Sequence, residues 1–138
     1  MTLYEYPGRA LVEWNAETNA LVIHVYNYSG TVEVFREIVV ERLFGLTKEK
    51  SPNAWIVDSS AATGAFQARS REILETEVFP AVASLGVGYL LVIPSAVSPL
   101  ATMTVESYAA GAEDIGITTV EVGSVAEAIE WLRRNAGG

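Results

Sequence analysis

The residues best suited to chemistry follow a short apolar run at residues 54–57. Asp58, Ser59 and Ser60 come directly after this run, and a loop of small residues then leads to Phe66 and a helical pattern. In an open α/β sheet, ligands bind at the loops that follow the carboxyl ends of the strands. Hydroxyls and a carboxylate there can bind a small polar or anionic ligand, and a Ser or Thr there can be phosphorylated. The candidate ligand or regulatory surface comprises Asp58, Ser59, Ser60, Thr63, Phe66, Ser95 and Ser98.

A purely structural role competes with both uses of this loop. Ser, Thr and Asp side chains often satisfy backbone groups in loops. The aromatic residues Tyr28, Phe66 and Tyr108 could line an apolar pocket, although core packing is the commoner role of such side chains. The sequence leaves these alternatives open.

No catalytic set accompanies these residues. His24 is the only histidine, it falls in a strand expected to lie inside the sheet, and the spacing supplies no carboxylate or nucleophile beside it. One His and no Cys leave only scattered carboxylates as metal ligands. Gly86-Val87-Gly88 precedes a strand instead of following one, so it does not fit a dinucleotide loop. We therefore predict a protein that is not an enzyme and has no catalytic residue, cofactor or metal.

The composition is that of one folded domain, residues 1–138. Half of the residues are hydrophobic and 19% are charged, which excludes a disordered chain. A net charge of −8 disfavours nucleic acid as a partner, because phosphates would be repelled. The chain has no apolar run of membrane-spanning length and no signal-peptide pattern at its start. We expect a cytoplasmic protein of bacterial type.

The elements that position the loop alternate between strands and helices. Two apolar stretches at 11–14 and 20–26 predict a hairpin, and the runs at 54–58, 89–94 and 117–122 predict further strands. Helices are expected after each of the last four strands. Their predicted limits are Thr31 to about Leu46, Gln67 to Leu85 with a kink or division at Pro80, Ser98 to about Asp114, and a last helix that Ser124 and Glu127 begin as a capping box.

The order ββαβαβαβα predicts an α/β fold in a single domain. Its sheet would be mixed and mainly parallel, with about five strands, an N-terminal β-hairpin and four helices. The order of the strands within the sheet does not follow from the sequence.

Several features occur in the order found in a known superfamily. These are the apolar hairpin, Thr31 and Phe35 at the first helix, Trp55 and Asp58 in the third strand, Glu77-Val78-Phe79-Pro80, and Ala128-Ile129-Glu130-Trp131-Leu132. In this order the chain resembles the SpoIIAA-like, or STAS-related, superfamily, in particular its small stand-alone STAS-like or CRAL-TRIO-like domains. The resemblance covers nearly all of the chain. It implies a protein-interaction or small-ligand module.

The resemblance does not extend to the family's phosphorylated serine. In anti-sigma-factor antagonists of the STAS family, that Ser follows an Asp where the helix after the third strand begins. Here Asp58 aligns with the strand end and the helix start reads Gly64-Ala65-Phe66, so no Ser matches.

Two functions follow as expectations. The first is a regulatory protein-interaction module that forms a homodimer or binds a regulatory protein, and the alternative is a binder of a small anionic or lipid-like ligand at the strand ends. Apolar residues at the start of the chain, Leu3, Tyr4 and Tyr6, would favour the dimer if they covered a neighbour. An enclosed pocket beneath Phe66 would favour the ligand.

Overall fold

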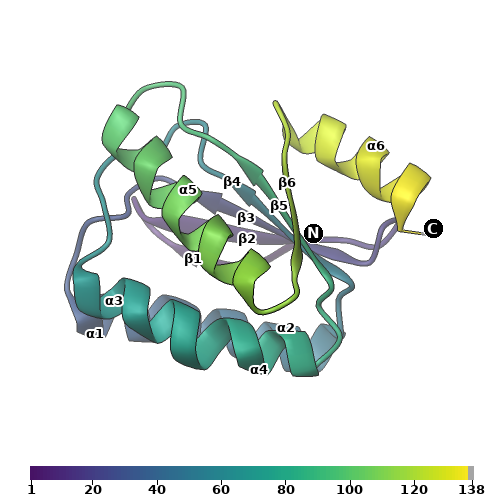
Figure 1. The fold of residues 1–138 in the computed structure, drawn as a ribbon, viewed down its shortest axis with the longest axis horizontal. Coiled ribbons are helices and arrows are strands. Elements are labelled where there is room, and N and C mark those ends of the chain that lie inside the picture. The colour runs from purple at the N-terminus through teal and green to yellow at the C-terminus, as the bar shows by residue number, and fades with distance from the viewer. Residues whose placement is uncertain (137–138) are drawn as a thin grey trace.

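The protein folds around one six-stranded sheet whose strands lie side by side in chain order. A computed structural model describes residues 1–136. It confirms the predicted α/β fold, in which a mostly parallel sheet carries an N-terminal antiparallel hairpin, and it adds one strand to the predicted five (Figure 1). The strands are β1 (Thr2–Tyr6), β2 (Ala10–Asn15), β3 (Ala20–Val25), β4 (Ala54–Asp58), β5 (Tyr89–Ile93) and β6 (Thr118–Glu121).

The unpredicted strand is β1, which pairs antiparallel with β2 at one edge of the sheet. A turn at residues 7–9 joins them, and Gly8 adopts φ +76° there, a conformation that favours glycine. Leu3 and Tyr4 pack against the core of their own chain. Both side chains are partly buried there.

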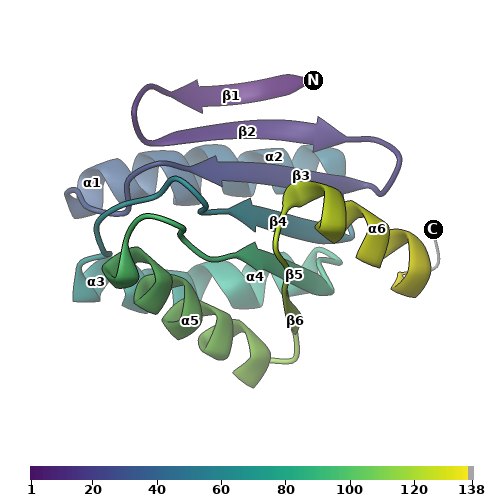
Figure 2. The same ribbon diagram turned by 90° about the horizontal axis from the view of Figure 1, so that it is seen from above.

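Helices cover the two faces of the sheet unequally. Strands β3 to β6 are parallel and adjacent in order, so successive right-handed crossovers place the intervening helices on one face. Figures 1 and 2 show α6 alone on the opposite face, near the end of the chain. The helical segments are α1 (Val32–Phe35), η1 (Arg36–Leu43) and α2 (Phe44–Lys50) as one continuous helix, α3 (Ala68–Ile73), η2 (Leu74–Val78) and α4 (Phe79–Ser84) as a second, then α5 (Pro99–Asp114) and α6 (Val125–Asn135).

The predicted helix starts are confirmed by hydrogen bonds. The hydroxyl oxygens of Thr31, Ser98 and Ser124 each accept a hydrogen bond from a backbone N–H in the first turn of α1, α5 and α6. At α6, Glu127 accepts from the N–H of Gly123, one residue before the cap, where the capping box predicted Ser124. Both carboxylate and hydroxyl thus satisfy backbone donors at the start of α6.

Pro80 changes the type of the second helix without ending it. Proline has no N–H and its ring crowds the preceding turn, so an ordinary i to i−4 bond is lost at this position. The π-helical segment η2 ends at Val78, two residues before Pro80, and α4 continues the helix from Phe79 to Ser84. The wider turn of a π-helix makes room for the ring.

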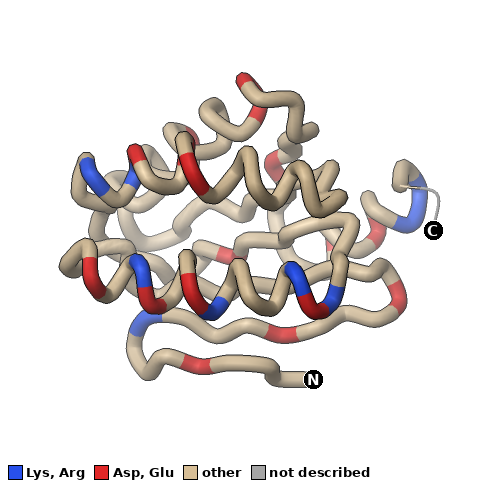
Figure 3. The backbone as a smooth tube through the Cα atoms, turned by 90° about the horizontal axis from the view of Figure 1, so that it is seen from below, with Lys and Arg blue, Asp and Glu red and all other residues tan. Residues whose placement is uncertain are grey.

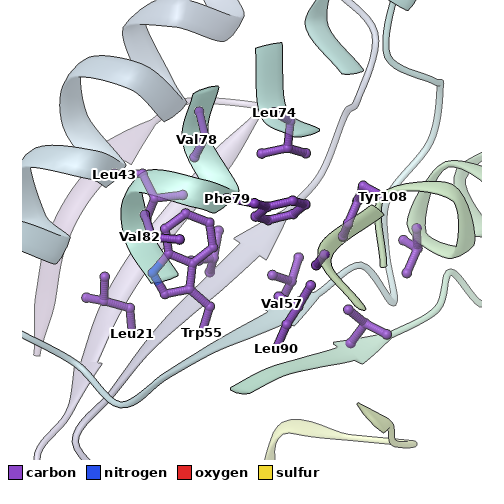
Figure 4. Close-up of a cluster of buried hydrophobic side chains, with 14 of the residues drawn as sticks. Leu21, Leu43, Trp55, Val57, Leu74, Val78, Phe79, Val82, Leu90 and Tyr108 are labelled. Carbon is purple, nitrogen blue, oxygen red and sulfur yellow. The ribbon is translucent and has the colours of Figure 1, made fainter. Parts of the chain in front are cut away.

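Buried side chains form a core on each face of the sheet. Trp55, Phe79 and Tyr108 lie in the larger core, beneath the helices from α1 to α5 (Figure 4). Ala128 and Leu132 of α6 pack on the smaller core, over Val22 and Ile56. Beyond this core the same face carries Leu11 of β2, His24 of β3 and Asp58 of β4, which lie side by side in the register.

Charged residues are dispersed over the helices and the N-terminal strands, with acidic and basic positions intermixed (Figure 3). Within the described residues no helix is both long enough and apolar enough to cross a bilayer.

Candidate functional site

An apolar cavity lies between the sheet and the helices at the carboxyl ends of β3 and β4. Its volume is about 90 Å³. Ile23 and Val57 line it from the strands, and Val39 and Leu74 line it from the π-helical segments η1 and η2. One water needs roughly 10–15 Å³, and an engineered apolar cavity of roughly 150 Å³ admits benzene. The space therefore suits a few carbon atoms and, being apolar, is a poor site for water.

Three aromatic rings line this cavity near the loop that follows β4. Phe66 packs edge-on against Tyr28, with ring centroids 4.9 Å apart, and edge-on against Phe35, at 5.2 Å. All three rings line the cavity, as does Tyr108. Edge-to-face packing of this kind holds each ring in a defined orientation. The three aromatic residues singled out in the sequence, Tyr28, Phe66 and Tyr108, thus come together around one space.

A buried chain of hydroxyl groups adjoins the aromatic wall. The hydroxyl of Tyr28 lies 2.5 Å from Ser59 Oγ and 2.8 Å from the hydroxyl of Tyr108. Burial raises the pKa of Tyr28 to about 12, and the hydrogen bonds with Ser59 and Tyr108 offset part of that effect. Burial also raises the pKa of Tyr108 well above its ordinary value. Both phenols are therefore neutral at physiological pH and serve as hydrogen-bonding groups.

The rim of the cavity is polar. Ser29 and Thr31 are exposed, Arg9 is half-buried, and all three line the opening. Arg9 Nη1 donates a hydrogen bond to the carbonyl of Ser29. Gly30 adopts φ +143°, and a Cβ there would lie 2.7 Å from Arg9 Nη1, so the absent side chain leaves room for the guanidinium.

The sheet separates the predicted site residues into two groups. Asp58 points to the face that α6 partly covers, where its Oδ2 lies 2.9 Å from His24 Nδ1. Ser59 is fully buried and contacts Tyr28, and Phe66 lies on the wall of the cavity. These neighbours in sequence therefore do not form one surface.

His24 lies between two carboxylates. Its Nε2 is 2.7 Å from Glu13 Oε1, and its Nδ1 contacts Asp58. The spacing in the sequence supplied no carboxylate beside His24, and the fold brings two to it from other strands. The partners come from β2 and β4, so only the pairing register of three strands brings them to the histidine.

The pKa of Asp58 is set by opposing effects. Partial burial tends to raise it, but hydrogen bonds from Ser60 and His24 outweigh burial and hold the pKa of this carboxyl below its ordinary value. Asp58 is therefore ionised at neutral pH. Because Glu13 and Asp58 bind opposite nitrogens of one ring, the three side chains do not converge on a common point, and the described residues contain no group suited to hold a metal ion.

The remaining candidate residues stabilise the loops. Ser60 is exposed, and its N–H donates to Asp58 Oδ1. Ser95 Oγ donates to the carbonyl of Ala62 and accepts from two N–H groups of its own loop, while Ser98 caps α5. Thr63 is exposed and exchanges backbone hydrogen bonds with the chain that follows β3.

Sequence reasoning missed Arg9 and Gly30 at the rim. The dipeptide Pro7-Gly8 was the available signal, because it marks a turn that would place Arg9 at the start of β2. The proximity of Arg9 to residues 29–31 depends on the register of β2 with β3, in which Ala10 pairs with Val25, and the predicted hairpin did not specify that register.

Comparison with known proteins adds no family to this description: no family model, no curated protein and no solved structure matches the chain.

Proposed function

We propose that the protein is a non-enzymatic binder of a small, mainly apolar molecule, which occupies the cavity beneath Phe66. The observation that carries this proposal is the cavity itself, which is apolar inside and polar at its rim. Pockets that bind small molecules combine apolar walls with a few polar groups in this way.

The local helix geometry supports the same proposal. Val39 lies in η1 and Leu74 in η2, so both π-helical segments contribute to the wall. Short π-helical segments occur frequently at functional sites. Tight packing in a core leaves few voids larger than a water molecule, so an apolar space of this size requires an explanation.

The proposal can be tested with an uncharged probe. In a titration of the ¹⁵N-labelled protein with 1-hexanol, we expect saturable shifts of the amide resonances of Ile23, Val57 and Phe66. Ala10→Leu adds carbons at a buried position that lines the cavity, so it should abolish these shifts while the rest of the spectrum stays folded. Ala126→Leu makes the same change at an exposed position of α6 and should leave binding intact. Absence of saturable shifts in the parent protein would refute the proposal.

A second candidate function is the regulatory protein-interaction role, with a homodimer or another protein as the partner, in the cytoplasm. It is favoured by a small apolar surface where α5 begins. Val97, Leu100 and Met103 are 64%, 54% and 63% exposed. Exposed apolar side chains that lie together mark interaction surfaces more often than isolated ones do.

Light scattering tests this candidate. A dimer at micromolar concentration that becomes monomeric with Met103→Glu would support it. A monomeric parent protein would rule out the homodimer and leave only a different protein as the partner.

A further inference from the structure

Among residues 1–136, Arg9 is the only charged residue that lines the cavity. The chain as a whole has 17 acidic and nine basic residues, so its net charge is negative. A single positive charge at this opening is therefore opposite in sign to the net charge of the protein. The other lining residues are apolar or carry neutral polar groups. The positive charge of Arg9 therefore attracts negatively charged groups to the rim.

Arg9 is also free to bind an anion. Among residues 1–136 the ion pairs involve His24, Arg69, Arg133 and Arg134, and none involves Arg9. One nitrogen, Nη1, donates to the carbonyl of Ser29. A guanidinium has five N–H donors in a planar fork, so several remain for a second partner. The bond to Ser29 holds the group beside the opening, which lowers the conformational entropy lost on binding.

These observations together define the ligand class. We infer that the cavity binds a short-chain aliphatic carboxylate, with its hydrocarbon tail among the apolar walls and its carboxylate on Arg9. This inference rests on the proposed function and adds to it the charge and the position of the head group. The cavity volume of about 90 Å³ limits the enclosed tail to a few carbons. A planar carboxylate matches the guanidinium fork in geometry, and the ion pair lies beside an apolar space, where it is stronger than in bulk water.

The test compares acids with alcohols of equal chain length. The probes are butanoate and hexanoate, paired with 1-butanol and 1-hexanol, and affinities are measured by NMR titration at neutral pH. In the parent protein each acid should bind roughly tenfold or more tightly than its alcohol, which is the effect of one charge-assisted hydrogen bond. The acid affinities should fall with added salt while the alcohol affinities change little.

Variants of Arg9 separate charge recognition from loop structure. Arg9→Gln keeps a hydrogen-bond donor but removes the charge, so it should weaken acid binding more than alcohol binding and thereby remove the preference for the acid. Arg9→Lys keeps the charge and should keep the preference. Gly30→Ala, whose Cβ would meet Arg9 Nη1, should weaken acid binding without changing the net charge.

The outcomes distinguish the two proposals. If acids and alcohols bind the parent protein equally, or if Arg9→Gln retains the preference, the anionic ligand class is wrong while the cavity still binds small molecules. If neither acids nor alcohols bind, the proposed function fails, and this inference fails with it.

Discussion

The hydroxyl groups of Tyr28 and Tyr108 lie 2.8 Å apart inside the protein, although 80 residues separate them in the chain. One follows β3 and the other lies in α5, so the bond joins the sheet to the helix that packs on it. Neither phenol can ionise without placing a charge in the core.

This pair predicts loss of stability at high pH. The folded-state pKa of Tyr28 is about 12, above its ordinary value of 10.0, and that of Tyr108 is also raised. A raised pKa contributes stability that is fully present below pH 10.0 and is lost as the pH rises toward 12. Urea unfolding, followed by circular dichroism at several pH values from neutral upward, measures this loss. Tyr108→Phe should make the alkaline loss smaller, and an unchanged pH dependence would contradict the assignment.

Asp58 predicts an acid-sensitive contribution to stability. Its pKa is held below the ordinary value of 3.8, so its contribution is present above that pH and is lost as the pH falls through the folded-state pKa. Asp58→Asn should lower the free energy of unfolding at neutral pH and reduce its fall in acid. Asp114→Asn makes the same change at an exposed position and serves as the control. Equal acid profiles for the two variants would argue against a special role of Asp58.

Ser124 should stabilise α6 through its cap. Ser124 Oγ accepts from the N–H of Glu127, and Ser124→Ala should lower the free energy of unfolding by about 1 kcal/mol. Hydrogen exchange should accelerate most in the first turn of α6. Ser84→Ala, at an exposed position in the last turn of α4, is the matched control, and an equal loss of stability in both variants would show that capping is not the cause.

Two leucines test the packing of the second core. Leu132 is 1% exposed and lies in the core beneath α6, whereas Leu100 is 54% exposed. Leu132→Ala should cost roughly 2–5 kcal/mol, since it removes buried methyl groups and leaves a cavity. Leu100→Ala should change stability by less than about 0.5 kcal/mol. Chemical denaturation measures both, and a small effect at Leu132 would mean that α6 is only loosely attached to the sheet.

Most of the local structure follows from patterns within short stretches of sequence. The strand at 54–58 was predicted with its observed limits. A short apolar run between Pro52 and a polar loop is too short for a typical helix, so a buried strand is the structure that it favours. The caps at Thr31, Ser98 and Ser124 followed from local chemistry, since a capping side chain and its N–H partner lie within three residues of each other. The alternation of strands and helices then determined the fold class.

Contacts between residues distant in sequence depend on the packing of whole elements. Strand β1 escaped prediction because a short edge strand with mixed burial has a weak pattern, and only its pairing with β2 defines it. The two carboxylates around His24, the ring of Tyr28, Phe35 and Phe66, and the position of Arg9 over Gly30 all depend on register and helix packing between distant segments. Such contacts follow from how whole elements pack, whereas local patterns describe only which element forms. Asp58 and Ser59 are adjacent in sequence, so a local pattern predicts one shared surface. In the fold their side chains point to opposite faces of the sheet, where Asp58 contacts His24 and Ser59 contacts Tyr28.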